Sequence, residues 1–508
     1  MSLCRLIRNS ARYCLAFVFL NTLILQASIS FGDENRPLSN ETLDLSALFP
    51  GGTTSVSVKR NNNAFSHPSA ALTFEDKLDF KVGKAVFEKL WVSSPSSTTA
   101  SDGLGPLYNA RSCARCHVNN GRGHAPGNKL EPSIIRPISL FVRLSIPPNL
   151  QQIESIDDGA IPFVPEPTYG AQLQGFANPG GHAEGRLKVR YETTMLSLNG
   201  GQVVTLYAPS YEVVALGYGP MHPKTMISPR VAPPMIGLGL LDNISSQDLE
   251  ALADPEDVDN NGISGRTRRV LNRKTGKIEV GRFGWKGGAP NLEQQNAAAL
   301  FHDIGIGSAL FPEPWGDCTT AQQDCRAAPH GNTARHEGLE ASKKLTQLLL
   351  DYTQHLSVPA RLERNESNNL DVRAGQKIFH EIGCADCHRP SFITRNNADH
   401  PTLSEQTIWP YTDLLLHDMG PGLADNRPEG NATGREWRTA PLWGLGFAPE
   451  QTLDKQTAQN KSYLHDGRAN NLIEAILWHG GEALASAESV KQLLPLQRQH
   501  LLDFLESL

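Results

Sequence analysis

The chain lacks several features that would place it in other broad classes of protein. Its 508 residues carry 47 Lys and Arg against 53 Asp and Glu, and the net charge of −6 implies no nucleic-acid partner. Beyond the first thirty or so residues, no apolar run is long enough to cross a bilayer. Cysteine is scarce, at 8 residues, which excludes a small scaffold held together by disulfides. A hydrophobic content of 39% and a charged content of 20% instead fit a globular protein with sizeable cores.

Two short motifs contain half of these cysteines. The pattern Cys-x-x-Cys-His occurs at residues 113–117 and again at 384–388. It is the attachment signature of a c-type haem, in which two thiols form thioethers with the haem vinyl groups and the histidine supplies the proximal nitrogen. Structural zinc is the alternative, but the other cysteines do not form the complementary pair that zinc would need. The sequence therefore predicts two covalently bound c-type haems, attached through Cys113, Cys116, His117, Cys384, Cys387 and His388.

The N-terminal 32 residues are typical of a secretory signal peptide. Three arginines precede an apolar stretch at 15–25, and small residues follow at Ala27, Ser28 and Ser30. We expect cleavage between residues 27 and 32 and a periplasmic location, with an uncleaved N-terminal anchor as the alternative. No stable membrane span is expected once the signal has been removed.

Export also bears on the cysteines outside the two motifs. Cys4 and Cys14 lie within the predicted signal, which leaves Cys318 and Cys325. In an oxidising compartment we expect these two residues to form a small loop disulfide. Export agrees with covalent haem as well, because that haem is attached outside the cytoplasmic membrane.

An internal repeat organises the chain. Residues 83–87 (Gly-Lys-Ala-Val-Phe) resemble residues 375–379 (Gly-Gln-Lys-Ile-Phe), and each stretch precedes a haem motif. We predict a mainly α fold of two cytochrome-c-like haem domains, with a β-containing insertion in the first half, where 138–146, 187–191 and 203–214 read as strands. The predicted boundaries are a signal peptide at 1–32, a flexible arm at 33–72, an N-terminal haem domain at 73–310 with its insertion at about 130–280, and a C-terminal haem domain at 335–508.

One loop within the insertion is close to a calcium-binding pattern. Asp257, Asp259 and Asn261 supply oxygens at alternate positions, a glycine follows for the turn, and Ile263 offers a backbone carbonyl. The twelfth position holds Arg268 in place of the usual glutamate, so any site would be completed differently. The alternative is a solvated turn rich in Asp and Asn.

Longer motifs add a family resemblance. The two haem motifs, the stretch 283–288 (Phe-Gly-Trp-Lys-Gly-Gly) and the stretch 463–476, which begins Tyr-Leu-His-Asp-Gly, resemble bacterial di-haem cytochrome c peroxidases. The di-haem enzyme that matures methylamine dehydrogenase belongs to the same group. Over most of its mature length the chain is similar to the peroxidase-like di-haem oxidoreductase family, as the segments 102–107, 169–173 and 417–420 indicate.

The resemblance implies a function. It implies a periplasmic di-haem c-type oxidoreductase that reduces peroxide at the N-terminal haem with electrons passed between the two haems. A small electron-donor protein would supply the electrons, and hydrogen peroxide or a partner protein would be the substrate. The alternative is an electron-transfer cytochrome with two six-coordinate haems and no substrate chemistry. A haem-anchored binding or maturation protein is a third possibility.

The resemblance also implies axial ligands for the C-terminal haem. In the peroxidases its second ligand is a methionine downstream of the histidine that corresponds to His465, and here that position is His479. This departure implies a bis-histidine haem held by His388 and His479, with a lower potential than His/Met ligation gives. Met419 is the alternative ligand, although a packing role suits it better. His124 is a possible sixth ligand of the N-terminal haem, at a spacing that the family does not use.

For chemistry at the N-terminal haem, the resemblance implies three residues. The tryptophan between the haems corresponds to Trp285, and the distal glutamine corresponds to Gln295. The family's acid falls at Gly305, close to Asp303, which we nominate as the general acid–base, with His302 as its substitute. The structural alternatives are a core tryptophan, a glutamine on a helix surface and a capping aspartate.

Overall fold

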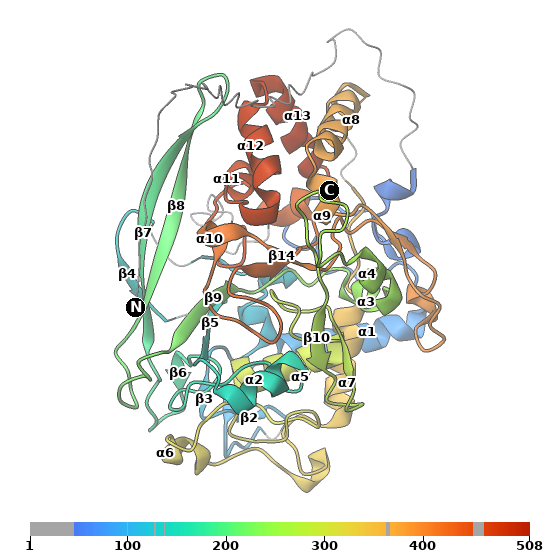
Figure 1. Cartoon of the computed structure of the whole chain (residues 1–508). Coiled ribbons are helices and arrows are strands. Elements are labelled where there is room, and N and C mark those ends of the chain that lie inside the picture. Colours follow the sequence, from blue (N-terminus) through green and yellow to red (C-terminus); the bar gives the residue numbers. More distant parts are fainter. Residues whose placement is uncertain (1–44, 99, 126–128, 137, 362–365, 451–461) are drawn as a thin grey trace, which may run out of the picture. The chain divides into compact units, whose positions relative to one another are not determined.

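The computed structural model describes residues 45–508, except for 99, 126–128, 137, 362–365 and 451–461 (Figure 1). The predicted signal peptide and the first part of the predicted arm lie outside the described residues. Among the described residues, no helix is both long enough and apolar enough to cross a membrane. The predicted disulfide between Cys318 and Cys325 is confirmed.

The described elements are mostly short helices and short strands, mixed along the chain. The helices are α1 (Phe74–Glu88), α2 (Leu150–Asp157), α3 (Leu238–Asp242), α4 (Ser246–Leu252), α5 (Leu292–Ala299), α6 (Gln323–Arg326), α7 (Lys343–Gln354), α8 (Glu366–Glu381), α9 (Cys384–Cys387), α10 (Gly420–Leu423), α11 (Leu472–Leu477), α12 (Leu484–Gln492) and α13 (Pro495–Leu505). The strands are β1 (Val92–Ser93), β2 (Asp102–Leu104), β3 (Leu107–Tyr108), β4 (Ser133–Ile135), β5 (Leu140–Ser145), β6 (Phe176–Ala177), β7 (Arg186–Ser197), β8 (Val203–Val214), β9 (Met226–Val231), β10 (Arg268–Leu271), β11 (Ile278–Gly281), β12 (Phe392–Ile393), β13 (Thr407–Ile408), β14 (Leu416–Asp418) and β15 (Glu436–Arg438).

The prediction of a mainly α fold with two cytochrome-c-like haem domains is wrong. Helix accounts for 31% of the structure and strand for 20%, so neither type dominates. Within the described residues the strands form seven small sheets, six of two strands and one of three. The β12–β13 and β14–β15 pairs lie in the second half, outside the predicted β insertion. Extended pieces of the long Gly- and Pro-rich loops pair with one another, so strand is not confined to one insertion.

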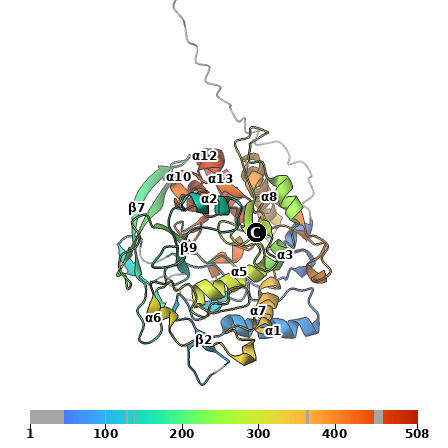
Figure 2. The ribbon, with the colours of Figure 1, turned by 60° about the horizontal axis from the view of Figure 1, so that its bottom comes forward.

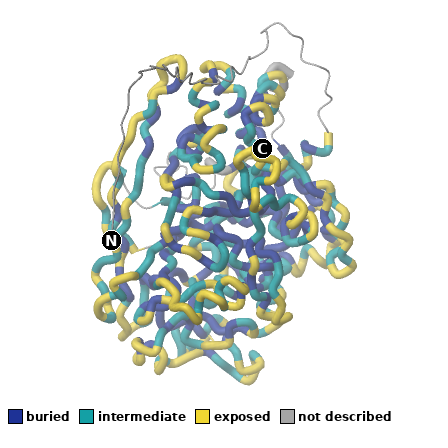
Figure 3. The backbone as a smooth tube through the Cα atoms, viewed as in Figure 1, coloured by how far each residue is buried: buried dark blue, intermediate teal, exposed yellow. Residues whose placement is uncertain are grey.

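A long hairpin is the largest sheet element. Strands β7 and β8 pair antiparallel along their whole length, and β4 pairs with the outer edge of β7. The hairpin runs beside α11, α12 and α13 (Figure 1), where Leu198, Val204 and Leu206 join a buried cluster with residues of α8 and α13. Strand therefore carries part of the core around the second haem motif, although most residues of the hairpin are exposed or of intermediate burial (Figure 3).

The repeat found in the sequence forms two equivalent helix pairs. Helix α1 packs against α7 (Figure 2), and α8 packs against α13. Gly83 and Gly375 lie at these crossings, where a Cβ on either residue would collide with a backbone carbonyl of the facing helix. Phe87 then lies 6.2 Å from the ring of His117, and Phe379 lies 6.4 Å from the ring of His388. Each repeat thus places a phenylalanine against the histidine of its own motif.

Residues from both halves of the chain share one core. Residues 44–508 group as a single compact unit, and one buried cluster joins Phe65, Ile236 and Phe283 to Phe392 and Trp443. The division into domains at 73–310 and 335–508 stays a prediction. The two haem motifs pack against two other clusters, Cys113 and Ala114 against one and Cys384 and Ala385 against the other.

Candidate functional site

The first motif presents one imidazole nitrogen to a cavity. Cys113 begins a single 3-10 turn, and His117 follows it with Nδ1 2.8 Å from the carbonyl oxygen of Pro233. A carbonyl only accepts, so Nδ1 carries the hydrogen and Nε2 keeps a free lone pair. Cys113 and Cys116 are free thiols that line the same cavity as His117. This is the donor set that a covalently attached haem needs.

The cavity gathers most of the predicted site residues of the first half. Its volume is about 680 Å³, within the range of cofactor pockets. Trp285, Gln295 and Asp303 line it together with the first haem motif, whereas His124 is not among its lining residues. The structure thus brings together residues that lie far apart in the sequence.

Asp303 lies at the end of the helix that follows the Trp285 loop. Helix α5 continues into a π-helical turn, Leu300–Ile304, a local irregularity that is frequent at functional sites. The side-chain amide of Gln172 donates a 2.7 Å hydrogen bond to Asp303 Oδ1. Burial raises the pKa of the Cys116 thiol to about 12, and the nearby Asp303 carboxylate contributes to the increase. The hydrogen bond from Gln172 therefore fixes the Asp303 carboxylate, which lies near enough to Cys116 to interact with its thiol.

His302, the substitute acid, has a different partner. Its Nδ1 lies 3.7 Å from the carboxylate of Asp317, and its ring packs against Phe301 and Phe311. Sequence reasoning missed the residues that surround this pair. Gln172 was noted only for its family resemblance, and Arg143, which lines the cavity from β5, was not noted at all.

Trp285 lies between the cavity and the second half of the chain. Its indole N–H donates a 2.7 Å hydrogen bond to the carbonyl of Val231, and its carbonyl accepts a 2.9 Å bond from the backbone N–H of Arg438. Its ring meets that of His465 edge-on, with 6.5 Å between centroids. His465 in turn stacks on Trp437 at 3.7 Å. Trp285 is thus fixed on both its ring and its backbone.

Two buried guanidinium groups flank Trp285. Arg122 lies over its ring and donates only to a backbone carbonyl, and its buried Nε has no partner in the described residues. In the part of the chain that the structure describes, the guanidinium of Arg438 also donates only to carbonyl oxygens, those of Gly284 and Thr439. Burial lowers the pKa of both groups to about 10. Neither has a carboxylate within ion-pair distance among the described residues, so the two propionates of a haem fit as their counter-ions.

The second motif pairs two imidazoles. His388 follows α9, with Nδ1 3.0 Å from the carbonyl oxygen of Tyr411. Nδ1 of His479 lies 2.8 Å from the carbonyl oxygen of Ala475. Burial lowers the pKa of His388 to about 4, and His479 lies close enough to contribute to that decrease. Both Nε2 atoms are left for other bonds, so the pair fits the two axial ligands of one haem.

The alternative ligand Met419 packs with Trp437 and Leu423 in a hydrophobic cluster, which agrees with the packing role preferred from the sequence. A neighbour of this methionine was missed. His417 lies 3.6 Å from Cys387 Sγ, and its nitrogens contact Asp413 and Glu482 at 2.7 Å each. Both of its nitrogens are engaged, so His417 supports the second motif and is not free to bind a metal.

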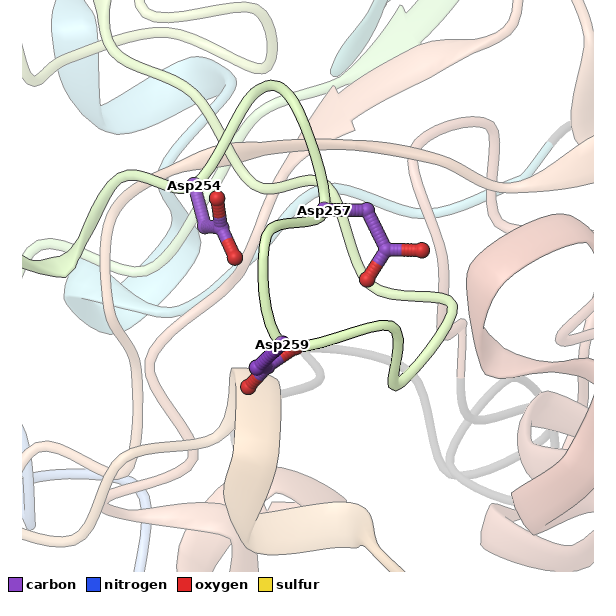
Figure 4. A group of neighbouring side chains, drawn as sticks. All are labelled: Asp254, Asp257 and Asp259. Carbon is purple, nitrogen blue, oxygen red and sulfur yellow. The ribbon is translucent and has the colours of Figure 1, made fainter.

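The acidic loop brings three carboxylates together. Oxygens of Asp254, Asp257 and Asp259 lie within 4.8 Å of one another on the loop between α4 and β10 (Figure 4). The side-chain oxygen of Asn261, a predicted ligand, accepts a 2.7 Å hydrogen bond from the backbone N–H of Ile263. Asp254 was not anticipated, because it precedes the motif. Calcium at this loop stays a prediction.

Comparisons with known proteins place the chain in a family. No curated protein matches it. Among solved structures, a chain of hydrazine synthase from Kuenenia stuttgartiensis, pressurised with 20 bar xenon, is 12% identical, with a TM-score of 0.27 over 72% of this chain and 89% of that chain. The family described as "Di-haem oxidoreductase, putative peroxidase" matches residues 46–508. The protein therefore belongs to the di-haem oxidoreductase family.

Proposed function

We propose that the protein is a periplasmic peroxidase that carries two covalently attached c-type haems. Peroxide would react at the haem of Cys113, Cys116 and His117, with electrons arriving from the haem of the second motif. One observation carries the proposal: a single cavity holds the first motif together with Trp285, Gln295 and Asp303. The haems, when bound, supply the electron transfer, and the protein supplies the binding, orientation and proton transfer.

Residues that line the cavity would transfer the protons that peroxide reduction requires. Reduction of hydrogen peroxide to two waters breaks the O–O bond and consumes two electrons and two protons. The Asp303 carboxylate would take a proton from one peroxide oxygen and return it to the other as that oxygen leaves. Gln172 donates to Oδ1 of Asp303 and so fixes the orientation of the acid. The amide of Gln295, which also lines the cavity, would hold the peroxide by a hydrogen bond.

A short chain of contacts supports electron entry by way of Trp285. The Trp285 carbonyl accepts from the backbone N–H of Arg438 at 2.9 Å. Arg438 lies on β15, which pairs with β14, and His417 on β14 contacts Cys387 of the second motif. The route therefore joins the cavity to the second haem motif through bonded and packed groups. We propose that a small electron-donor protein supplies the electrons to the second haem.

A substitution of Asp303 tests the proton-transfer role. Asp303→Asn keeps the size of the side chain but removes the base, and we expect the rate of peroxide reduction to fall by about 10²–10⁴-fold, the usual contribution of a general acid–base group. His302→Gln is the control, because His302 lies against Asp317 and should affect the rate much less. Full peroxide turnover in Asp303→Asn would remove Asp303 from the mechanism. Unchanged optical spectra would show that both haems are still attached.

We also propose that the acidic loop binds a calcium ion and that this ion has a structural role. The carboxylates of Asp254, Asp257 and Asp259 supply the oxygen ligands that calcium prefers. Calorimetric titration of the chelator-treated protein with calcium would show a saturable site that Asp257→Asn weakens. Heat of dilution alone would exclude calcium from the loop.

A further inference from the structure

A second internal repeat links the two haem sites. Residues 283–299 and residues 463–479 form the same loop and helix in the two halves of the chain. Each loop is closed by an antiparallel bridge, Phe283 with Ala289 in the first and Tyr463 with Ala469 in the second. Residues in equivalent positions share glycine, alanine, asparagine and leucine: Gly287 and Gly467, Ala289 and Ala469, Asn291 and Asn471, Leu292 and Leu472.

The backbone of the two loops matches in detail. Gly287 and Gly467 both adopt left-handed conformations, with φ of 64° and 75°. Asn291 and Asn471 both cap a helix, each accepting a 2.9 Å hydrogen bond from the backbone N–H three residues on. Helix α5 therefore corresponds to α11. Trp285 and His465, whose rings meet edge-on, occupy equivalent positions in the two loops.

This correspondence pairs Ala299 with His479. Ala299 lies as many residues after its cap, Asn291, as His479 lies after Asn471. Ala299 is the last residue of α5 and lines the cavity that holds His117. His479 lies just beyond the end of α11, and Leu477 at that end of the helix packs in one hydrophobic cluster with Cys384 and Ala385 of the second motif. At equivalent positions, the second half of the chain therefore has the imidazole of His479 and the first half has the methyl group of Ala299.

The two side chains differ in what they offer a metal. The Nε2 of His479 has a lone pair, because its Nδ1 is engaged by the Ala475 carbonyl. Ala299 has no donor atom, so it leaves space where the other half of the chain has a ligand. Of the other histidines considered for the first site, His124 does not line the cavity. His302 lines it, with its Nδ1 3.7 Å from the carboxylate of Asp317 and without a hydrogen bond in the described residues, so it is the rival ligand that the test must separate from an open position.

We infer that Ala299 leaves the sixth coordination position of the first haem open, so that this position binds a peroxide or another small ligand of similar size. The inference rests on the proposed haem at His117 and extends it, because it names the residue that makes one haem reactive and the other closed. The two halves of the chain would then differ in function through one substitution at an equivalent position.

The test introduces the missing ligand. In the wild-type protein we expect one high-spin haem that binds cyanide and one low-spin haem that does not. In Ala299→His we expect the high-spin signal in the electron paramagnetic resonance spectrum to be replaced by a second low-spin signal. Cyanide binding should be lost at concentrations that saturate the wild-type protein. Ala299→Leu is the matched control: it fills the same space without a donor atom, so cyanide binding should weaken while the haem stays high-spin.

Two results would overturn the inference. A wild-type protein with two low-spin haems and no cyanide binding would show that another residue, such as His302, closes the first site. A high-spin first haem in a folded Ala299→His protein would show that this position does not face the iron. Neither readout uses peroxide turnover, and haem content is measured separately by the pyridine haemochrome. Loss of the proposed peroxidase activity is therefore distinguishable from failure of this inference.

Discussion

Three histidines of the candidate sites share one arrangement. His117, His388 and His479 each have Nδ1 within 3.0 Å of a backbone carbonyl oxygen. The contact fixes the ring and leaves Nε2 as the only lone pair, as is usual for histidines that bind metals. The pattern is not sufficient alone, because His355 makes the same contact with Asp351 without facing a haem motif.

His355 therefore provides a control for the ligand role of His479. We expect His479→Ala to convert the C-terminal haem from low-spin to high-spin and to create a second site for cyanide. His355→Ala removes a similarly held imidazole elsewhere and should leave both haem spectra unchanged. An unaltered low-spin signal in His479→Ala would assign the second ligand to another residue, with Met419 as the next to be substituted.

The buried carboxyl group of Glu340 makes the free energy of unfolding depend on pH. Glu340 is 1% exposed and accepts hydrogen bonds from the backbone N–H groups of Gly307 and Gly331. Burial raises its pKa to about 7 from the ordinary 4.5. Between these values the folded protein keeps a proton that the unfolded chain releases, so this group's contribution to stability falls as the pH rises from 4.5 to 7.

The expected size of this effect is about 3 kcal/mol, from the shift in pKa. We expect Glu340→Gln to remove it, so that the free energy of unfolding of the wild type relative to the variant is greater at pH 5 than at pH 8. Chemical unfolding at the two pH values measures the difference. Glu337→Gln, at an exposed position nearby, should follow the wild type at both values. A constant difference between wild type and Glu340→Gln across this range would contradict the assignment.

At the residue scale, local spacing predicted the two haem motifs, whereas the distant residues Trp285, Gln295 and Asp303 were predicted only through the family resemblance. The cysteines and His117 or His388 lie within five consecutive residues, so their pattern is visible without a structure. Gln172 reaches Asp303 across 131 positions, and no spacing rule connects two such residues. The equivalence of Ala299 and His479 became visible only through matching caps and bridges, because few of the intervening residues are identical.

Among the elements, long strands were predictable and short ones were not. The predicted strand 203–214 has the observed bounds of β8, because twelve residues rich in β-branched and aromatic side chains give a clear signal. Strands of two to four residues, such as β12 and β14, give no periodicity to detect. These short pairs show that strand is not confined to the predicted insertion, and the mainly α prediction was wrong because helix makes up only 31% of the structure.

Two substitutions in the β7–β8 hairpin test whether the hairpin stabilises the buried core of the second half. Leu206 of β8 is 6% exposed and packs with residues of α8 and α13, whereas Val203 on the same strand is 57% exposed. We expect Leu206→Ala to lower the free energy of unfolding by about 2–5 kcal/mol, as deletion of a buried leucine does. Val203→Ala should change it by less than about 0.5 kcal/mol. Equal effects of the two substitutions in chemical unfolding would show that the hairpin is not part of this core.

At the scale of the whole molecule, the two candidate haem sites are built in the same way, and we propose that they differ in one ligand. Both sites have a glycine-bearing helix, a Cys-x-x-Cys-His motif and a capped loop-helix segment. One core joins residues of both halves, and the contacts through Trp285, Arg438 and His417 connect the sites. A pure electron carrier would need neither the asymmetry nor the acidic and amide groups of the first cavity.

The most direct test of this account is an electron paramagnetic resonance spectrum of the oxidised and half-reduced holoprotein, recorded with and without hydrogen peroxide. We predict one low-spin haem with two histidine ligands and one high-spin haem, and we predict that peroxide alters only the high-spin signal. Two low-spin haems that respond neither to half-reduction nor to peroxide would contradict the account and make the protein an electron carrier.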